Sequence, residues 1–368
     1  MELIEQACRY FKPDTPCSFH KRRGTVCRTC RSFRPVRDEI LIIKREALGD
    51  VLRTTSLLQP LKKAYPDSRL VWLCAPSARD VLAGNPLIDE IWTDDFWTTT
   101  AASLVHWNAL YNFDLSFESL VVAASVSAER KYGFRFDERR RIICSNDAAE
   151  EWFFISHDDR AKKANRNTYQ EFLRRICGFD RIGDIIVPLN GEAIREAASL
   201  FRTHRITGRC VGLNVGSGDR WVTKRWPVAS WLALAERLGR KHPVALLGGE
   251  GEREEIAWLK KRSAVPLFDC STPGSLPLFF AVVARCSLVV TGDTLALHAA
   301  LGLGRKVVAL FGPTSAAEIE QYGNGASLVT PFACSCCYRR RCSRHPSCMK
   351  AISPVSVARA AERLLARR

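Results

Sequence analysis

The sequence predicts an α/β protein with two doubly wound, parallel-sheet domains, and three observations support this prediction. The apolar runs 40–43 and 70–73 flank a helical segment, which is the pattern of a βαβ unit. The same pattern starts again at Cys210. Strands of the second half end in glycine and a small polar residue, as at Gly292-Asp293. Ligands of doubly wound sheets bind at such strand ends, so we expect the functional site there.

The elements of the first half follow from local patterns. The continuous apolar run 40–43 indicates a strand buried on both faces. A helical segment opens at Asp50, carries apolar positions as far as Leu61, and ends at Pro66-Asp67. Further along the chain we expect strands over 70–73, 113–117 and 131–134 and a helix over 169–177.

The second half repeats the alternation of strands and helices. We expect strands over 210–215, 244–247, 288–290 and 307–310, with helices between them and at the C-terminus. The resulting division of the chain is a cysteine-rich arm over 1–37, an N-terminal domain over 38–195, a C-terminal domain over 196–355 and a C-terminal helix over 356–368.

The charge balance favours an anionic partner. The chain has 55 Lys and Arg against 39 Asp and Glu, for a net charge of +16. No basic run is interleaved with stacking aromatic residues, so we place a phosphorylated sugar or a membrane surface above nucleic acid as the partner.

The chain has neither an apolar stretch of the ~18 residues that a bilayer span needs nor an N-terminal apolar signal. We therefore expect a cytoplasmic protein with peripheral membrane contact.

The loop Leu48-Gly49-Asp50 follows the first strand and allows two interpretations. Gly49 permits a tight turn and a close backbone approach. Asp50 at a helix start is either an N-cap, which is common for aspartate, or a general base that takes a proton from a hydroxyl group.

The second half carries candidate anion contacts at three strand ends. Gly216-Ser217-Gly218 is followed closely by the basic pair Lys224-Arg225, which suits a phosphate, although an ordinary turn with a solvated basic pair has the same appearance. The other candidates are Glu250 after the glycine pair 248–249, and Asp293 and Thr294 with His298 one helical turn later. A lone histidine such as His298 is also a common core residue. The absence of G-x-G-x-x-G after either leading strand disfavours a dehydrogenase, and the absence of G-x-x-x-x-G-K-[ST] disfavours a P-loop NTPase.

Five segments in order resemble glycosyltransferase family 9, the ADP-heptose:lipopolysaccharide heptosyltransferase family. They are ILIIKREALGDVLRTT, GLNVGSGDRWVTKRWP, LLGGEGERE, VVTGDTLALHAALG and ALFGPT, within residues 38–365. The resemblance implies a GT-B fold of two Rossmann-like domains facing a cleft. It also implies an inverting, metal-independent transfer of heptose from ADP-heptose to a lipopolysaccharide core-type acceptor.

The resemblance assigns roles by position. Asp50 looks like the catalytic base, and Lys224 looks like the lysine that binds phosphate. The other residues that the resemblance places at the donor are Gly49, Ser217, Gly218, Glu250, Asp293, Thr294 and His298. Leu295 departs from the glycine usual after the Asp-Thr pair, which leaves open a different donor or a protein or glycan acceptor. A non-catalytic nucleotide-sugar binding protein is the third alternative.

The arm carries four cysteines, Cys8, Cys17, Cys27 and Cys30, and His20 lies among them. The closing C-x-x-C is a good chelate, and four thiolates suit a structural zinc ion or an iron–sulfur cluster. Free thiols on a flexible segment are the alternative. A second group of cysteines lies between Cys334 and Cys348. The transfer chemistry itself needs no cofactor, so any metal is expected to be structural.

Overall fold

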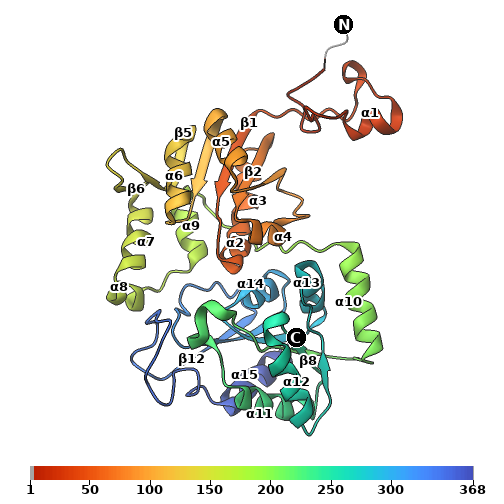
Figure 1. Ribbon diagram of the computed structural model, residues 1–368, viewed down its shortest axis with the longest axis vertical. Helices are drawn as coiled ribbons and strands as arrows, with labels where there is room; N and C mark the ends of the chain where they lie inside the picture. The colour runs from red at the N-terminus through yellow and green to blue at the C-terminus, as the bar shows by residue number, and fades with distance from the viewer. Residues whose placement is uncertain (1–3, 368) are drawn as a thin grey trace.

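The computed structural model describes residues 4–367, and the side chains of residues 4–218 and 221–367. The first three residues of the predicted arm and residue 368 of the predicted C-terminal segment lie outside this range. Two six-stranded sheets, each flanked by helices, lie one above the other in Figure 1. Their strand orders are β3-β2-β1-β4-β5-β6 and β12-β11-β10-β7-β8-β9. The predicted fold of two doubly wound α/β domains is confirmed.

The N-terminal sheet is parallel apart from its last pair, β5 with β6. Its strands are β1 (Asp38–Ile43), β2 (Ser68–Cys74), β3 (Glu90–Thr93), β4 (His106–Asn112), β5 (Ser127–Phe136) and β6 (Ile142–Cys144). Residues 40–43 of β1 are fully buried, because the central strand is covered by helices on both faces. The expected strands over 40–43, 70–73 and 131–134 are therefore confirmed.

The helices of this domain are α2 (Leu48–Thr54), α3 (Leu58–Ala64), α4 (Arg79–Leu82), α5 (Phe96–Leu104), α6 (Phe117–Ser125), α7 (Asp147–His157), α8 (Asp159–Ala164) and α9 (Tyr169–Cys177). The predicted helix over 169–177 is confirmed. The predicted strand over 113–117 is wrong, because β4 ends at Asn112 and α6 begins at Phe117. The Ser116 hydroxyl accepts from the Ser119 N–H at 3.3 Å, so this residue caps a helix where alternating apolar residues suggested a strand.

The C-terminal sheet is parallel throughout. Its strands are β7 (Val211–Asn214), β8 (Val244–Leu247), β9 (Leu267–Asp269), β10 (Leu288–Gly292), β11 (Lys306–Phe311) and β12 (Gly325–Val329). Its helices are α11 (Val228–Gly239), α12 (Arg253–Arg262), α13 (Leu276–Arg285), α14 (Leu295–Gly302) and α15 (Pro354–Ala366). The four predicted strands are confirmed. The C-terminal helix begins two residues before the predicted 356, because Ser353 caps it and Pro354 occupies its first turn.

Helix α10 (Gly191–Thr203) connects the two sheets and packs against α13. The predicted boundary at residue 195 falls inside this helix. The segment before it also packs on the C-terminal domain, since Ile185 and Val187 lie against Gly302 of α14. Helix α14 in turn packs against α2 of the N-terminal domain, which brings the start of α2 to the C-terminal domain.

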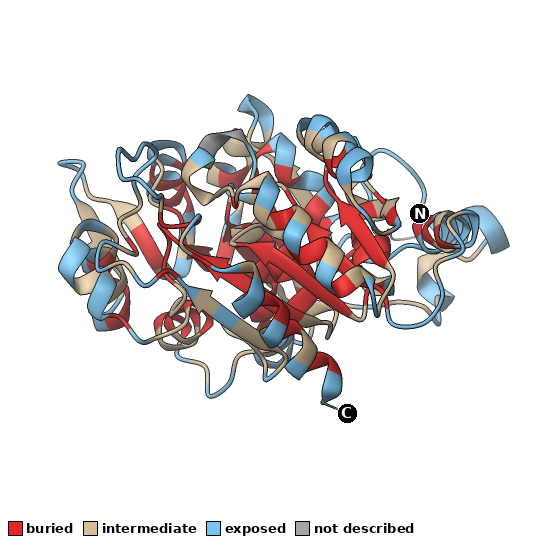
Figure 2. Cartoon of the chain, turned by 90° about the horizontal axis from the view of Figure 1, so that it is seen from below, coloured by how far each residue is buried: buried red, intermediate tan, exposed pale blue. Residues whose placement is uncertain are grey.

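The arm projects from the top of the N-terminal domain in Figure 1 and contains the short helix α1 (Ser18–Arg23). Arg9 anchors it by binding the Asp89 carboxylate and donating to the Ser68 carbonyl at 2.6 Å. Figure 2 shows that the buried residues follow the strands of both domains and the helix faces turned toward them. Within residues 4–367, no helix is long and apolar enough to cross a membrane.

Gly133 of β5 offers a test of the N-terminal sheet. Its φ is +87°, and a Cβ added there would collide with the backbone carbonyl of Asn112 on β4. We expect Gly133→Ala to lower the free energy of unfolding by about 2–4 kcal/mol, because it combines backbone strain with a clash against fixed backbone. Urea denaturation measures this loss. Gly208→Ala is the matched control, because Gly208 has φ +74° with open space around it, so its expected loss is only about 1 kcal/mol. Equal losses would contradict the proposed clash.

Candidate active site

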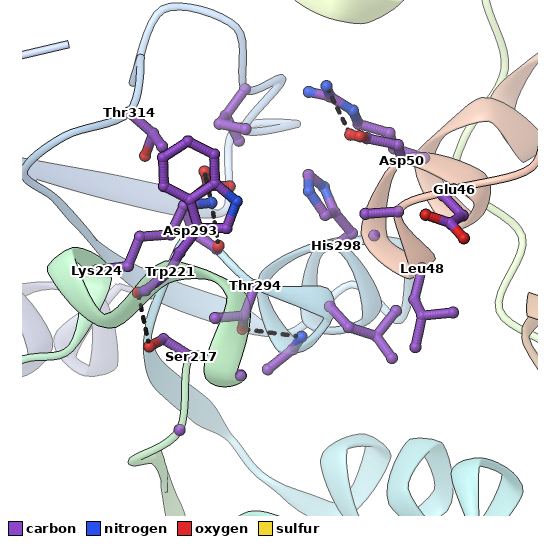
Figure 3. Close-up of a pocket in the computed structure, with 18 of the residues that line it drawn as sticks. Glu46, Leu48, Asp50, Ser217, Trp221, Lys224, Asp293, Thr294, His298 and Thr314 are labelled. Atoms are coloured by element: carbon purple, nitrogen blue, oxygen red, sulfur yellow. Dashed lines mark hydrogen bonds and ion pairs between the residues drawn. The ribbon is translucent and has the colours of Figure 1, made fainter. Parts of the chain in front are cut away.

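A cleft of about 1140 Å³ lies between the two domains at the carboxyl ends of their strands. Figure 3 shows Asp50 and Glu46 on the N-terminal side facing Lys224, Asp293 and His298 from the C-terminal side. All but one of the predicted catalytic and donor-binding residues line it: Gly49, Asp50, Ser217, Gly218, Lys224, Asp293, Thr294 and His298. The structure thus brings these residues together from three segments that are far apart along the chain.

Asp50 lies in the first turn of α2, and its carboxylate forms an ion pair of 2.8 Å with Arg53. The N-cap of this helix is Ala47, so the interpretation of Asp50 as an N-cap is wrong. The side chain is 38% exposed and turns into the cleft. A carboxylate in the first helical turn is stabilised by the helix dipole. Because Asp50 is not the capping side chain, its carboxylate is available to a ligand in the cleft.

The charge of Asp50 is fixed by its surroundings. Burial alone raises the pKa of this carboxyl, but the positive charges of Arg53 and Lys44 outweigh burial. With smaller contributions from His298 and Lys224, they lower the pKa to about 2. Asp50 is therefore ionised at neutral pH, in the form that accepts a proton.

Lys224 and Asp293 form an ion pair on the opposite wall. The Lys224 ammonium lies 2.9 Å from the Asp293 carboxylate and donates to the Asp293 carbonyl at 3.2 Å. Burial raises the pKa of Asp293, but Lys224 and His298 lower it more, so the pair is charged. This arrangement holds the Lys224 ammonium at the carboxyl end of β10, where it can bind an anionic ligand.

His298 lies on α14 and is 4% exposed, as expected of a core histidine, yet it also borders the cleft. Burial is the main cause that lowers the pKa of His298, and the charge of Arg53 is the next. Together they lower this pKa to about 4, so the ring is neutral at pH 7. A Cβ added at Gly49 would come within 2.8 Å of the His298 Cδ2 atom. Glycine is thus required at position 49 for α2 and α14 to approach each other.

Hydrogen bonds beneath the cleft floor join the carboxyl end of β7 to the residues that follow β10. The Asn214 amide donates to the Gly216 carbonyl at 3.1 Å and to the Thr294 hydroxyl at 3.3 Å. Thr294 caps α14 by accepting from the Ala296 N–H at 3.2 Å. The Ser217 hydroxyl lies in the cleft wall, 3.5 Å from the Trp221 carbonyl to which it donates. The loop 216–218 is therefore held in place, with Gly218 at a φ of +66°.

Glu250 does not reach the site. Its side chain is 65% exposed and pairs with Arg253 at 2.6 Å, and it does not line the cleft. Glu252 occupies the expected place instead, since it lines the cleft and accepts from the Gly249 N–H at 2.9 Å. The chain makes a 3-10 turn at Glu250–Glu252, which carries the second glutamate back over the glycine pair.

Two groups of buried polar residues in the cleft were missed by sequence reasoning. The Lys44 ammonium binds the Asp114 carboxylate beside Asp50, and Asp114 also accepts from the Arg45 N–H at 2.5 Å. The second group spans both domains: Arg53 lies 4.0 Å over the ring of Tyr169. It also contacts the Glu318 carbonyl at 3.5 Å.

Glu318 in turn accepts from the Tyr338 hydroxyl at 2.9 Å, and burial raises its pKa. No local motif marks these residues, because their partners lie far along the chain.

The arm does not assemble the predicted metal site in this structure. Among the side chains described, those of residues 4–218 and 221–367, there is no group of three or more His, Cys, Asp or Glu arranged to hold a metal ion. Cys27 opens the 3-10 helix Cys27–Thr29 and Cys30 follows it, while Cys8 pairs by backbone with Pro35. The structural metal at Cys8, Cys17, Cys27 and Cys30 stays a prediction.

Comparison with known proteins finds one family. Residues 197–347 match the model of glycosyltransferase family 9 (heptosyltransferase). The chain is 23% identical over 338 residues to lipopolysaccharide heptosyltransferase 1 of Pseudomonas aeruginosa, which covers 84% of this chain and 88% of that protein. It is 25% identical over 317 residues to lipooligosaccharide heptosyltransferase 2 of Haemophilus influenzae, covering 79% and 88% of the two chains.

Solved structures share the fold. The glycosyl transferase family 9 from Veillonella parvula has a TM-score of 0.71 at 20% identity, covering 89% of this chain and 97% of that one. The E. coli heptosyltransferase WaaC with ADP-2-deoxy-2-fluoro heptose has a TM-score of 0.58 at 17% identity, covering 88% and 99%. The iron-containing dodecameric glycosyltransferase TibC of E. coli has a TM-score of 0.53 at 15% identity, covering 90% and 76%. With its GT-B fold, a C-terminal domain that matches glycosyltransferase family 9 (heptosyltransferase) over residues 197–347, and heptosyltransferases among the relatives that match most of its length, this chain is similar to the glycosyltransferases of that family.

Proposed function

We propose that this protein transfers a heptose from ADP-heptose to a lipopolysaccharide core-type acceptor, with inversion at the anomeric carbon. The observation that carries the proposal is the ionised Asp50 of one domain facing the Lys224–Asp293 pair of the other across a single cleft. The names of the relatives support the sugar and the acceptor, and the ligand named with WaaC supports the nucleotide.

In the proposed reaction, Asp50 takes the proton of the acceptor hydroxyl as its oxygen attacks the anomeric carbon of the donor. The bond from that carbon to the diphosphate breaks, and its electron pair leaves with ADP. Lys224 faces the developing charge on the diphosphate, together with backbone N–H groups of the loop around Ser217 and Gly218. Thr294 and His298 at the start of α14 contact the donor, and Glu252 takes the ribose role that the sequence had suggested for Glu250.

The low pKa of Asp50 in the free protein makes it a weak base, and donor binding changes this. The carboxyl is held acidic by four positive or partly positive neighbours, Lys224 among them. A bound diphosphate would pair with Lys224 and add negative charge beside the carboxylate. Both effects raise the pKa of Asp50, so its basicity increases when the donor is in place.

We further propose that the transfer needs no metal ion. Lys224 supplies positive charge where a metal-dependent enzyme uses a divalent cation, and α14 begins at the same edge of the cleft. A zinc ion or iron–sulfur cluster in the arm would then be structural. Because the proposed acceptor is lipid-linked, we place the reaction in the cytoplasm at the inner membrane surface.

Calorimetric titration of the protein with ADP-heptose, UDP-sugars and GDP-sugars tests the donor. We expect ADP-heptose to bind at least about tenfold more tightly than the others, because base recognition adds contacts that differ between nucleotides. A chelator in the buffer is expected to leave both binding and turnover unchanged. Preference for UDP or GDP would overturn the heptosyl assignment, and loss of turnover with chelator would overturn metal independence.

A different donor within the same family is the second candidate. Leu295 lines the cleft directly after the Asp-Thr pair, where the family usually has glycine, and its bulk changes the space for the donor sugar. The donor panel decides between the two. A non-catalytic binding protein is disfavoured by the charged Asp50 and Lys224 in one cleft.

The pH dependence of kcat/KM tests the charge on the base. Since the pKa of Asp50 is about 2 and that of His298 is about 4, neither should titrate in the free enzyme above about pH 5. Arg53 lowers both pKa values. We expect Arg53→Gln to raise both and to move the acidic limb of the profile to higher pH, whereas Arg53→Lys keeps the charge and the wild-type limb. An unmoved limb in Arg53→Gln would contradict this electrostatic assignment.

A further inference from the structure

Helices α5 and α6 expose an unusual amount of apolar side chain on the N-terminal domain. Trp97 is 77% exposed, Phe96 71% and Leu104 80%, all on α5. On α6, Phe117 is 55% exposed and Val121 43%. The two helices pack beside each other over one face of the sheet, so these residues share one surface, which we call the α5–α6 surface.

This surface lies at the mouth of the cleft. Arg45 lines the cleft, and its guanidinium binds Asp94 and, at 3.1 Å, Glu118. Asp94 precedes Phe96 by two residues, and Glu118 follows Phe117 directly. One cleft-lining arginine therefore ties together the starts of both helices, and the exposed aromatic residues flank the N-terminal side of the opening, where the proposed acceptor enters.

Basic side chains adjoin the aromatic residues. The turn between β5 and β6 carries Arg139, Arg140 and Arg141, all exposed. The guanidinium of Arg140 lies 5.4 Å from the centre of the Phe117 ring, which places this turn against the α5–α6 surface. Asp137 forms an ion pair of 2.7 Å with Arg141. The positive charge of the three arginines therefore exceeds the negative charge of the acidic groups beside them.

We propose that the α5–α6 surface, together with the arginine turn 139–141, docks on an anionic membrane surface and points the cleft mouth at the lipid headgroups. Exposed Trp and Phe beside Arg form the combination that binds at a lipid–water interface, where rings enter the headgroup region and cations meet anionic lipids. The protein's net charge of +16 has the matching sign. A second copy of this chain would bring a like-charged arginine turn and a like net charge, which opposes self-association at this surface. The choice of a membrane as partner rests on the proposed lipid-linked acceptor.

Co-sedimentation of the full chain with vesicles tests the proposal. We use vesicles of equal parts phosphatidylglycerol and phosphatidylcholine, and vesicles of phosphatidylcholine alone. Wild type should partition onto the anionic vesicles and much less onto the neutral ones. The triple variant F96S/W97S/F117S and the charge variant R139E/R140E should each weaken this partition by about tenfold or more.

Matched controls separate this surface from general charge and hydrophobicity. V329S/V355S removes exposed apolar groups from the C-terminal domain, and K260E/K261E reverses charges at the end of α12. Both should bind vesicles as wild type does. Equal losses in test and control variants, or no loss in the test variants, would overturn the proposal. A change of oligomeric state in F96S/W97S/F117S by sedimentation velocity, with vesicle binding intact, would show instead that a second copy covers the surface.

The same variants separate this inference from the proposed function. None of the substituted residues lines the cleft, so ADP-heptose binding by calorimetry should match wild type in all of them. If wild type binds vesicles through this surface but binds no ADP-heptose, the proposed donor fails and the docking surface stands. If donor binding is normal and vesicle binding is absent, the docking surface fails alone.

Discussion

Replacing Asp50 by asparagine is expected to lower kcat by about 10²–10⁴-fold while ADP-heptose still binds, because the amide keeps the shape of the carboxylate but cannot take a proton. Arg53 loses its 2.8 Å partner in this variant, so folding must be checked by thermal denaturation. Donor affinity comes from calorimetry, and kcat comes from release of ADP with a core-type acceptor.

Glu250→Gln is the matched control for Asp50→Asn. It makes the same chemical change at an acid that the resemblance had placed at the donor but that the structure places on the surface, 65% exposed. We expect wild-type turnover in this control. Turnover of Asp50→Asn close to wild type would remove Asp50 as the base, and loss of donor binding together with turnover would assign it to the donor site instead.

Replacing Lys224 by alanine is expected to weaken ADP-heptose binding by about 10–100-fold, the range for one lost charge-assisted contact. Two causes act in the same direction. The cation that would face the diphosphate is gone, and Asp293, which lies 2.9 Å from it in the wild type, is left as an unpaired negative charge facing an anionic ligand. Calorimetry measures the loss directly.

Two further variants divide these causes. In the double variant K224A/D293A the repulsion is removed too, so affinity should partly recover relative to Lys224→Ala. Lys241→Ala removes a lysine that is 65% exposed and pairs with Glu362 far from the cleft, and it should bind the donor as wild type does. Unchanged affinity in Lys224→Ala would exclude Lys224 from the donor site.

Most strands were predictable because a buried parallel strand must be apolar along its whole length. The runs 40–43, 244–247 and 307–310 all form strands inside a sheet, with a neighbour on each side, for this reason. The segment 113–117 was not predictable in this way. Its apolar residues alternate, yet the Ser116 cap begins a helix there, and both patterns are short enough for the tertiary setting to choose between them.

The sequence by itself determined the two sheets, their glycine-rich strand ends and nearly all candidate site residues, because these depend on local backbone chemistry and ordered motifs. Only the tertiary structure decided which acids reach the cleft. Asp50 enters it because Ala47, and not Asp50, is the N-cap of α2, and Glu252 replaces Glu250 because a 3-10 turn reverses the chain. Arg53, the strongest of the charges that lower the pKa of Asp50, lies three residues along the same helix, but only the fold adds Lys44 and Lys224 from other segments of the chain. Coulomb interactions between distant segments, and burial, act through space, so no spacing along the chain encodes these two contributions.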